Sequence, residues 1–203
     1  MKKFFLLLLL FITVNSIVFA EDNTLRTYSF GHSSIIREAF DKEVFMNRSQ
    51  ESLKLISMGI EAIVKAKYEI RNAIGVVGCE KIGIVVKDNN DARRKFKNVQ
   101  DIHIDAVKVN QIIQSGTDGQ KEAIRKALSK ANYYEREGKQ YFVRANKHIS
   151  WLFHRWCFGK VVYDLKSKEE HIIYRSVKET RNIAIEFERD IEEEFKQYYK
   201  VLP

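Results

Sequence analysis

Residues 53–77 read LKLISMGIEAIVKAKYEIRNAIGVV, and the pattern in this stretch decides the fold. Its regularly spaced positions alternate in steps of three and four and hold large apolar side chains, apart from one lysine: Leu53, Ile56, Ile60, Ile63, Lys67, Ile70, Ile74 and Val77. This spacing is typical of one face of a helix that packs against other helices. We therefore predict a long helix from about Ser49 to near Gly78, in which Lys67 sets the register or the oligomeric state.

The same periodicity continues through the rest of the chain. The only proline is Pro203, the last residue, which favours long uninterrupted helices. Gly138 is the one position in these patterns where we expect a kink or an interruption. The apolar positions predict three further helices, over residues 91–114, 124–156 and 173–198. Long helices joined by short turns predict an all-α fold, an elongated antiparallel bundle similar to a coiled coil.

Smaller elements are expected at the edges of this bundle. The apolar residues between 34 and 46 have the spacing of a short docking helix. Residues 82–86 and 160–165 are rich in valine and isoleucine and could form a minor pair of short strands. The predicted organisation is a signal peptide over residues 1–20, an N-terminal segment over 21–48 and a bundle domain over 49–203.

The first twenty residues have the form of a secretory signal peptide. Lys2 and Lys3 are followed by an apolar run from Phe4 to Val14, and small residues precede a cut after Ala20. Eleven apolar residues are too few to cross a hydrocarbon core of about 30 Å, so we expect cleavage rather than anchoring. The sequence thus predicts a secreted or periplasmic protein, and cleavage lowers the formal net charge of +8 by the two lysines.

Export also affects how the two cysteines and one asparagine are interpreted. In an oxidising compartment Cys79 and Cys157 are more typical of a disulfide than of a metal or nucleophile site. The pairing assumes that the first and third long helices end at the same pole of the bundle. Two separately buried thiols are the alternative. Asn47 begins an Asn-Arg-Ser triplet, which matches a glycosylation sequon.

Charge along the chain is divided between two segments. Residues 121–155 hold nine Lys or Arg and three Glu, whereas residues 186–194 hold six Asp or Glu and one Arg. Antiparallel neighbours with these charges would neutralise each other, which weakens the case for a polyanionic partner. Export and the lack of a recognisable motif argue against nucleic acid.

The candidate binding site lies in the aromatic segment from Tyr141 to Tyr163. Helical geometry places Trp151 and Phe158 opposite the apolar face, beside Arg144, Lys147 and Arg155. Cations four residues from Trp151 can form cation–π contacts, and such a surface suits a protein, an acidic glycan or lipid headgroups. The alternative is that Trp151 packs under residues 21–48 or against a second subunit.

We expect no cofactor and no metal site, because His154 and Cys157 form only half of a zinc site. The function predicted is a non-enzymatic binding or structural protein of the envelope, such as an adhesin, a spacer or an accessory subunit of a secretion apparatus. One alternative is a periplasmic coiled-coil holdase. Another is a small basic wall-cleaving hydrolase with Glu61 or Glu69 as its acid.

Overall fold

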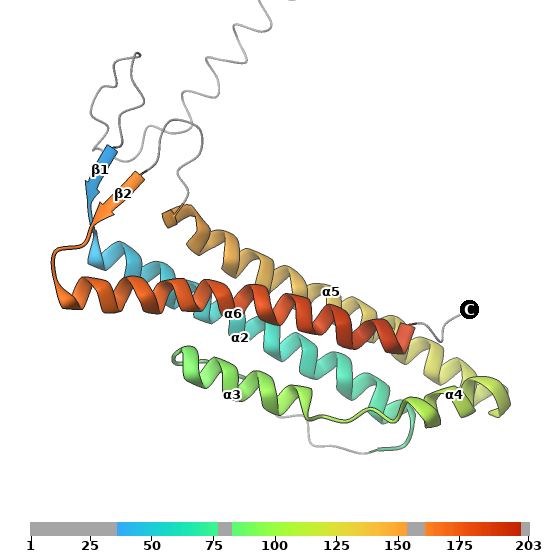
Figure 1. Ribbon diagram of the computed structural model, residues 1–203. Helices are drawn as coiled ribbons and strands as arrows, with labels where there is room; N and C mark the ends of the chain where they lie inside the picture. The colour runs from blue at the N-terminus through green and yellow to red at the C-terminus, as the bar shows by residue number, and fades with distance from the viewer. Residues whose placement is uncertain (1–35, 77–82, 154–160, 200–203) are drawn as a thin grey trace, which may run out of the picture. The chain divides into compact units, whose positions relative to one another are not determined.

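The computed structural model describes residues 36–76, 83–153 and 161–199, which all belong to one compact unit, residues 35–203. The other unit, residues 1–34, lies outside the described residues, and so does the expected signal peptide. In chain order the elements are β1 (Ile36–Ala39), α2 (Lys42–Ala73), α3 (Asn89–Gln100), α4 (Ala106–Ser115), α5 (Asp118–Phe153), β2 (Val161–Asp164) and α6 (Lys168–Tyr199) (Figure 1). The predicted all-α antiparallel bundle is confirmed.

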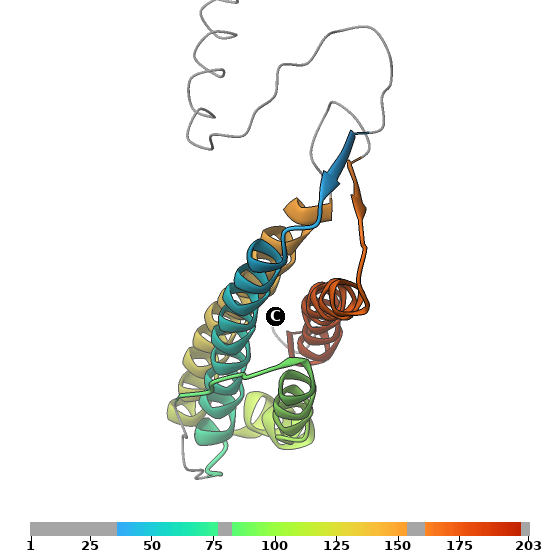
Figure 2. The same cartoon turned by 90° about the vertical axis from the view of Figure 1, so that its left-hand side faces the viewer.

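Three long helices form the bundle, and α2 packs against both of the others (Figures 1 and 2). Contacts Glu51–His148 and Glu69–Lys130 show that α2 and α5 are antiparallel. Contacts between Ser49 and Thr180 and between Lys67 and Glu194 show that α2 and α6 run in the same direction. The expected alternation of four long helices is therefore wrong, because the second segment folds as two shorter helices.

That second segment was expected to be one helix over residues 91–114, but it is interrupted between α3 and α4. Asp105 starts a new helix, because its carboxylate accepts a hydrogen bond from the Lys108 amide at 2.9 Å. The side chain of Ile104 is buried in the break. The apolar period alone did not reveal this internal N-cap.

The region before the first long helix also differs from expectation. Residues 36–39 form a strand rather than the start of a helix over 34–46, and α2 begins at Lys42 and continues through Ser49. Asp41 caps α2 by accepting a hydrogen bond from the Val44 amide at 3.0 Å. The helix ends in a Schellman motif at Gly75, whose φ is +78°, rather than at Gly78.

The minor sheet contains one of the two expected strands. β2 lies within the predicted range 160–165, but its partner is β1, in a parallel pair with Ile36 opposite Val161 and Ala39 opposite Asp164. Residues 83–87 are extended without forming a strand, and the Val86 amide donates to the Ser57 hydroxyl at 2.9 Å. The expected pairing of residues 82–86 with 160–165 is therefore wrong.

The core of the bundle contains the predicted apolar positions. Ile56, Ile60, Ile63 and Ile70 of α2 are all fully buried. A second, aromatic-rich cluster lies near the strands and consists of Phe40, Phe45, Ile149, Leu152 and Val177 with surrounding aromatic rings. α5 runs unbroken past Gly138. The helix is therefore not interrupted at this glycine.

Candidate functional site

The outward side of α5 is the surface that the sequence singled out around Trp151. Exposed residues recur along it at helical spacing. Besides Glu122 and Lys126, which form an ion pair with each other, six of them carry positive charge or an aromatic ring: Arg125, Tyr133, Arg136, Arg144, Lys147 and Trp151. We call these six residues the basic–aromatic face. At 100° per residue they fall within an arc of about 100°, and they extend over about 39 Å of helix. Trp151, Arg144 and Lys147 are all exposed on α5 and lie within this arc.

The four cations of the basic–aromatic face are not neutralised within the described part of the chain. Arg125, Arg136, Arg144 and Lys147 form no ion pair with any described residue, although Arg144 lies 5.8 Å from the centre of the Tyr141 ring. Other basic residues of α5 do pair: Lys126 with Glu122, Lys130 with Glu69 and Lys139 with Glu192. The face thus keeps an excess of positive charge.

Among the described residues, the predicted neutralisation of α5 by the acidic segment of α6 is found at one ion pair. Lys139 binds Glu192 at 3.3 Å, which is the contact expected between the two helices. Two other acids of that segment bind different helices, Glu186 to Arg93 of α3 and Glu194 to Lys67 of α2. Because α6 directs part of its negative charge elsewhere, the outward charge of α5 is left in place.

Trp151 is 45% exposed. The cation over its ring belongs to α2, whereas the sequence suggested cations of α5 itself. The guanidinium carbon of Arg48, on α2, lies 4.8 Å from the centre of the indole ring. Arg48 also contacts His148 Nδ1 at 3.2 Å, and His148 Nε2 in turn contacts Glu51. The structure thus combines both earlier interpretations, since a residue of segment 21–48 lies over a tryptophan that remains partly exposed.

Several predicted site residues lie outside the described residues. These are the binding-site candidates Arg155 and Phe158, the half zinc site His154 with Cys157, and the disulfide partner Cys79. The geometric reason for pairing the cysteines is wrong, however. Because α2 and α5 are antiparallel, the helix ends that precede Cys79 and Cys157 lie at opposite ends of this helix pair.

The carboxylates suggested for a hydrolase are occupied by ion pairs. Glu61 binds Lys65 at 2.9 Å, and Glu69 binds Lys130 at 3.5 Å. Both side chains are about a quarter exposed, whereas a catalytic acid of this type needs an apolar pocket that keeps it protonated. Neither residue has the surroundings of such an acid.

Glu135 is the carboxyl group that sequence reasoning missed. It occupies a position of the apolar face of α5 and is only 6% exposed. Burial raises its pKa above the ordinary value, while Tyr199 and Lys139 oppose that shift. Lys139 lies 3.9 Å away. The signal was present in the sequence, since a glutamate at a core position has to be paired or protonated.

Lys67 is fully buried and joins three parts of the bundle. Its ammonium group donates to the carbonyl oxygens of Val99, Gln100 and Ile102 at 2.7–3.3 Å, and it binds Glu194 at 2.5 Å. Burial lowers the pKa of Lys67, and the contact with Glu194 opposes that effect. The ammonium thus donates to carbonyls at the end of α3 and just beyond it, one of which, that of Val99, also accepts from the Ile102 amide at 3.2 Å. Lys67 is a structural residue rather than part of a surface site.

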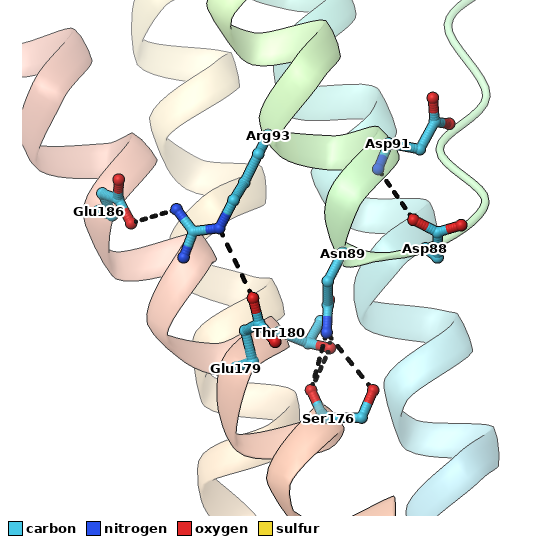
Figure 3. Close-up of polar contacts among 8 residues, drawn as sticks. All are labelled: Asp88, Asn89, Asp91, Arg93, Ser176, Glu179, Thr180 and Glu186. Carbon is cyan, nitrogen blue, oxygen red and sulfur yellow. Dashed lines mark hydrogen bonds and ion pairs between the residues drawn. The ribbon is translucent and has the colours of Figure 1, made fainter.

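The start of α3 is fixed to α6 by a polar network (Figure 3). Asn89 donates to the Ser176 carbonyl at 2.9 Å and accepts from the Thr180 hydroxyl at 2.8 Å. Arg93 binds Glu186 at 2.9 Å and lies 3.6 Å from Glu179 (Figure 3). These side chains hold the two helices together.

A groove of about 290 Å³ lies beside this network, between α2, α3 and α6. Most of its lining surface is contributed by apolar atoms, although six of the eleven residues involved are polar: Met46, Ser49, Gln50, Leu53, Lys87, Asp88, Asn89, Ile172, Ile173, Ser176 and Val177. Its polar side chains are partly used by the helix contacts, since Asn89 binds α6 and Asp88 caps α3. The groove therefore holds no evident catalytic group.

Neither a metal-binding cluster nor a membrane-spanning helix is found in the described part of the chain. No three His, Cys, Asp or Glu side chains in that part of the chain are grouped so that they could hold a metal ion. Across the same residues, no helix combines the length and the apolar character needed to cross a bilayer. Comparison with known proteins finds no match, since no family model, no curated protein and no solved structure is significantly similar to this chain.

Proposed function

We propose that this protein is an exported, non-enzymatic binding protein of the cell envelope or extracellular space. In this proposal the basic–aromatic face of α5 binds an anionic partner. The observation that carries the proposal is the set of four exposed cations without an ion pair among the described residues, aligned with Tyr133 and Trp151. Surfaces that combine arginine with exposed tryptophan and tyrosine are typical of binding sites.

The surroundings of the acidic residues favour binding over hydrolysis. Glu61 and Glu69 are held in ion pairs, and the more deeply buried Glu135 lies beside Lys139 within the helix packing. In the groove between α2, α3 and α6, the Asn89 side chain donates a hydrogen bond to α6. A binding role requires only the exposed surface of α5, which the bundle presents on one uninterrupted helix.

The binding test compares crosslinked partners from intact cells that express wild-type protein, Trp151→Ala or the double variant R144E/K147E. We expect the two face variants to lose partners that the wild type recovers. The matched control is R175E/K178E, which makes the same charge change at exposed positions of α6. An unchanged partner profile in both face variants would refute the proposed role of this face.

Export is tested separately through Cys79 and Cys157. The compartment is now the only support for a disulfide, because the described parts of α2 and α5 end at opposite ends of this antiparallel helix pair. We expect alkylation of the exported protein to add mass only after reduction. Two thiols that are freely alkylated in the native exported protein would contradict the disulfide.

A further inference from the structure

We infer that the anionic partner of the basic–aromatic face is the surface of a bilayer that contains anionic lipids. This inference rests on the proposed function, because it names the partner of the same face. The protein would lie on the bilayer as a peripheral protein, with α5 against the headgroups. Acidic proteins and acidic glycans are then competing partners, and the experiment below separates them from lipid.

The shape of the face favours a broad partner over a small one. The six residues are exposed along about 39 Å of the outward side of one helix, which we call the ridge. Small ligands are bound in concave sites, and the groove of about 290 Å³ lies between α2, α3 and α6 and includes no residue of α5. A ridge with separated cations can contact many lipid headgroups at once.

The two aromatic residues have the chemistry of the membrane interface. Tyr133 is 65% exposed and Trp151 is 45% exposed, and they lie five helical turns apart on the same side of α5. Tyrosine and tryptophan are enriched at headgroup level because each has an apolar ring and a polar group. Arg48 beside the indole adds a further cation at that end of the ridge.

The charges near the ridge also favour an anionic surface. Two carboxylates beside it contact basic side chains, Glu122 with Lys126 and Glu51 with His148. Glu137 accepts a hydrogen bond only from the uncharged Tyr141 hydroxyl, at 3.5 Å, and keeps its negative charge. The positive charge of Arg125, Arg136, Arg144 and Lys147 therefore predominates on this side. Each such cation strengthens binding to anionic lipid, and salt screens the attraction.

The apolar side of α5 is used elsewhere, which limits how deeply the protein can bind. Ile124, Leu128, Phe142 and Ile149 are fully buried in the bundle, so they are not available for insertion into the hydrocarbon. Binding through charge and two aromatic rings should be reversible and sensitive to salt. This behaviour differs from that of an inserted amphipathic helix.

The test is flotation of the full-length chain with phosphatidylcholine vesicles, with and without about 30% phosphatidylglycerol, because basic residues respond to anionic lipid. We expect more binding to the anionic vesicles than to the neutral ones, and loss of that difference when the salt rises from about 0.05 M to about 0.5 M. R144E/K147E should lower the partition coefficient at least about tenfold, because it reverses two cations. Trp151→Ala should lower it less, and R175E/K178E should leave it near the wild-type value.

All variants share the apolar run from Phe4 to Val14. A difference in flotation between two variants therefore cannot come from this run. Equal flotation with neutral and anionic vesicles, or equal flotation of R144E/K147E and R175E/K178E, would overturn the lipid inference. If vesicles fail but R144E/K147E loses a crosslinked protein or glycan in cells, the lipid inference fails and the proposed function stands. If R144E/K147E changes neither readout, both fail.

Discussion

Gly138 lies where α5 crosses α2 closely, and Gly59 is its neighbour on the facing helix. A Cβ atom at Gly138 would lie 2.7 Å from Ile63 Cδ1 and 3.0 Å from the Gly59 carbonyl oxygen. A Cβ at Gly59 would meet the Phe142 ring at 2.4 Å. These two positions lack side chains because the helices approach each other there.

Gly138→Ala should lower the free energy of unfolding by about 1–3 kcal/mol, because overpacking outweighs the better helix propensity of alanine. The matched control is Gly119→Ala in the first turn of the same helix, where no atom lies within 4 Å of the added Cβ. That control should be neutral or stabilising by up to about 1 kcal/mol. Urea unfolding of both variants checks the prediction, and equal effects would contradict the close crossing.

The burial of Glu135 should make its contribution to the stability of the fold depend on pH. Burial raises its folded-state pKa above the ordinary 4.5, so the ionised form costs stability at neutral pH. That cost disappears as the pH falls through the raised pKa and the carboxyl group is protonated. Glu135→Gln should therefore be more stable than wild type at pH 7, with the difference shrinking at about pH 4.

Urea unfolding of Glu135→Gln and wild type at the two pH values measures this difference directly. Glu193→Gln is the control, because Glu193 is an exposed carboxylate on α6 without an ion pair among the described residues. A Glu135→Gln variant that is less stable than wild type at pH 7 would show that pairing with Lys139 outweighs burial.

At the scale of elements, Lys67 holds the end of α3 against α2. Its ammonium group binds three carbonyl oxygens at the end of α3 and just beyond, and Arg71, one turn later, donates to the His103 carbonyl at 3.2 Å. The lysine that interrupted the apolar pattern therefore determines how the α3–α4 segment docks. It does so within one chain, whereas the sequence suggested register or oligomeric state.

Lys67→Met should destabilise the fold by about 3–5 kcal/mol, because Glu194 and the carbonyl groups lose their buried partner. Hydrogen exchange should accelerate first in residues 89–104, the segment that the ammonium holds. Glu194→Gln should cost less, because the lysine keeps its three carbonyl acceptors. Unchanged exchange in residues 89–104 of Lys67→Met would contradict this role.

The sequence predicted a helix correctly where local sequence signals determine that helix. The apolar period identified α2, α5 and α6, and the separate ranges predicted for 91–114 and 124–156 agree with the observed boundary between α4 and α5 at Gly116 and Thr117. The strand β1 was not predictable, because four residues with two apolar positions form it only by pairing with β2 more than a hundred residues later. The break at residues 101–105 was missed because it lies within a continuous apolar period.

At the scale of the whole molecule, the sequence predicted the composition of the candidate site better than its contacts. Arg144, Lys147 and Trp151 share one exposed face, as helical geometry required. The cation over Trp151 is Arg48, which lies 103 residues earlier and meets the indole only through the packing of α2 against α5. The charge of α5 persists because Glu186 and Glu194 bind α3 and α2.

The central claim is that the basic–aromatic face is the part of the molecule that contacts its partner. The most direct test places a photo-crosslinking amino acid at Gln140, which is exposed in the middle of this face, and separately at Arg175 on the outer side of α6. Irradiation of intact cells should give lipid adducts, or adducts with another anionic partner, from position 140 and few from position 175. Equal yields from the two positions, or adducts from position 175 alone, would contradict the claim.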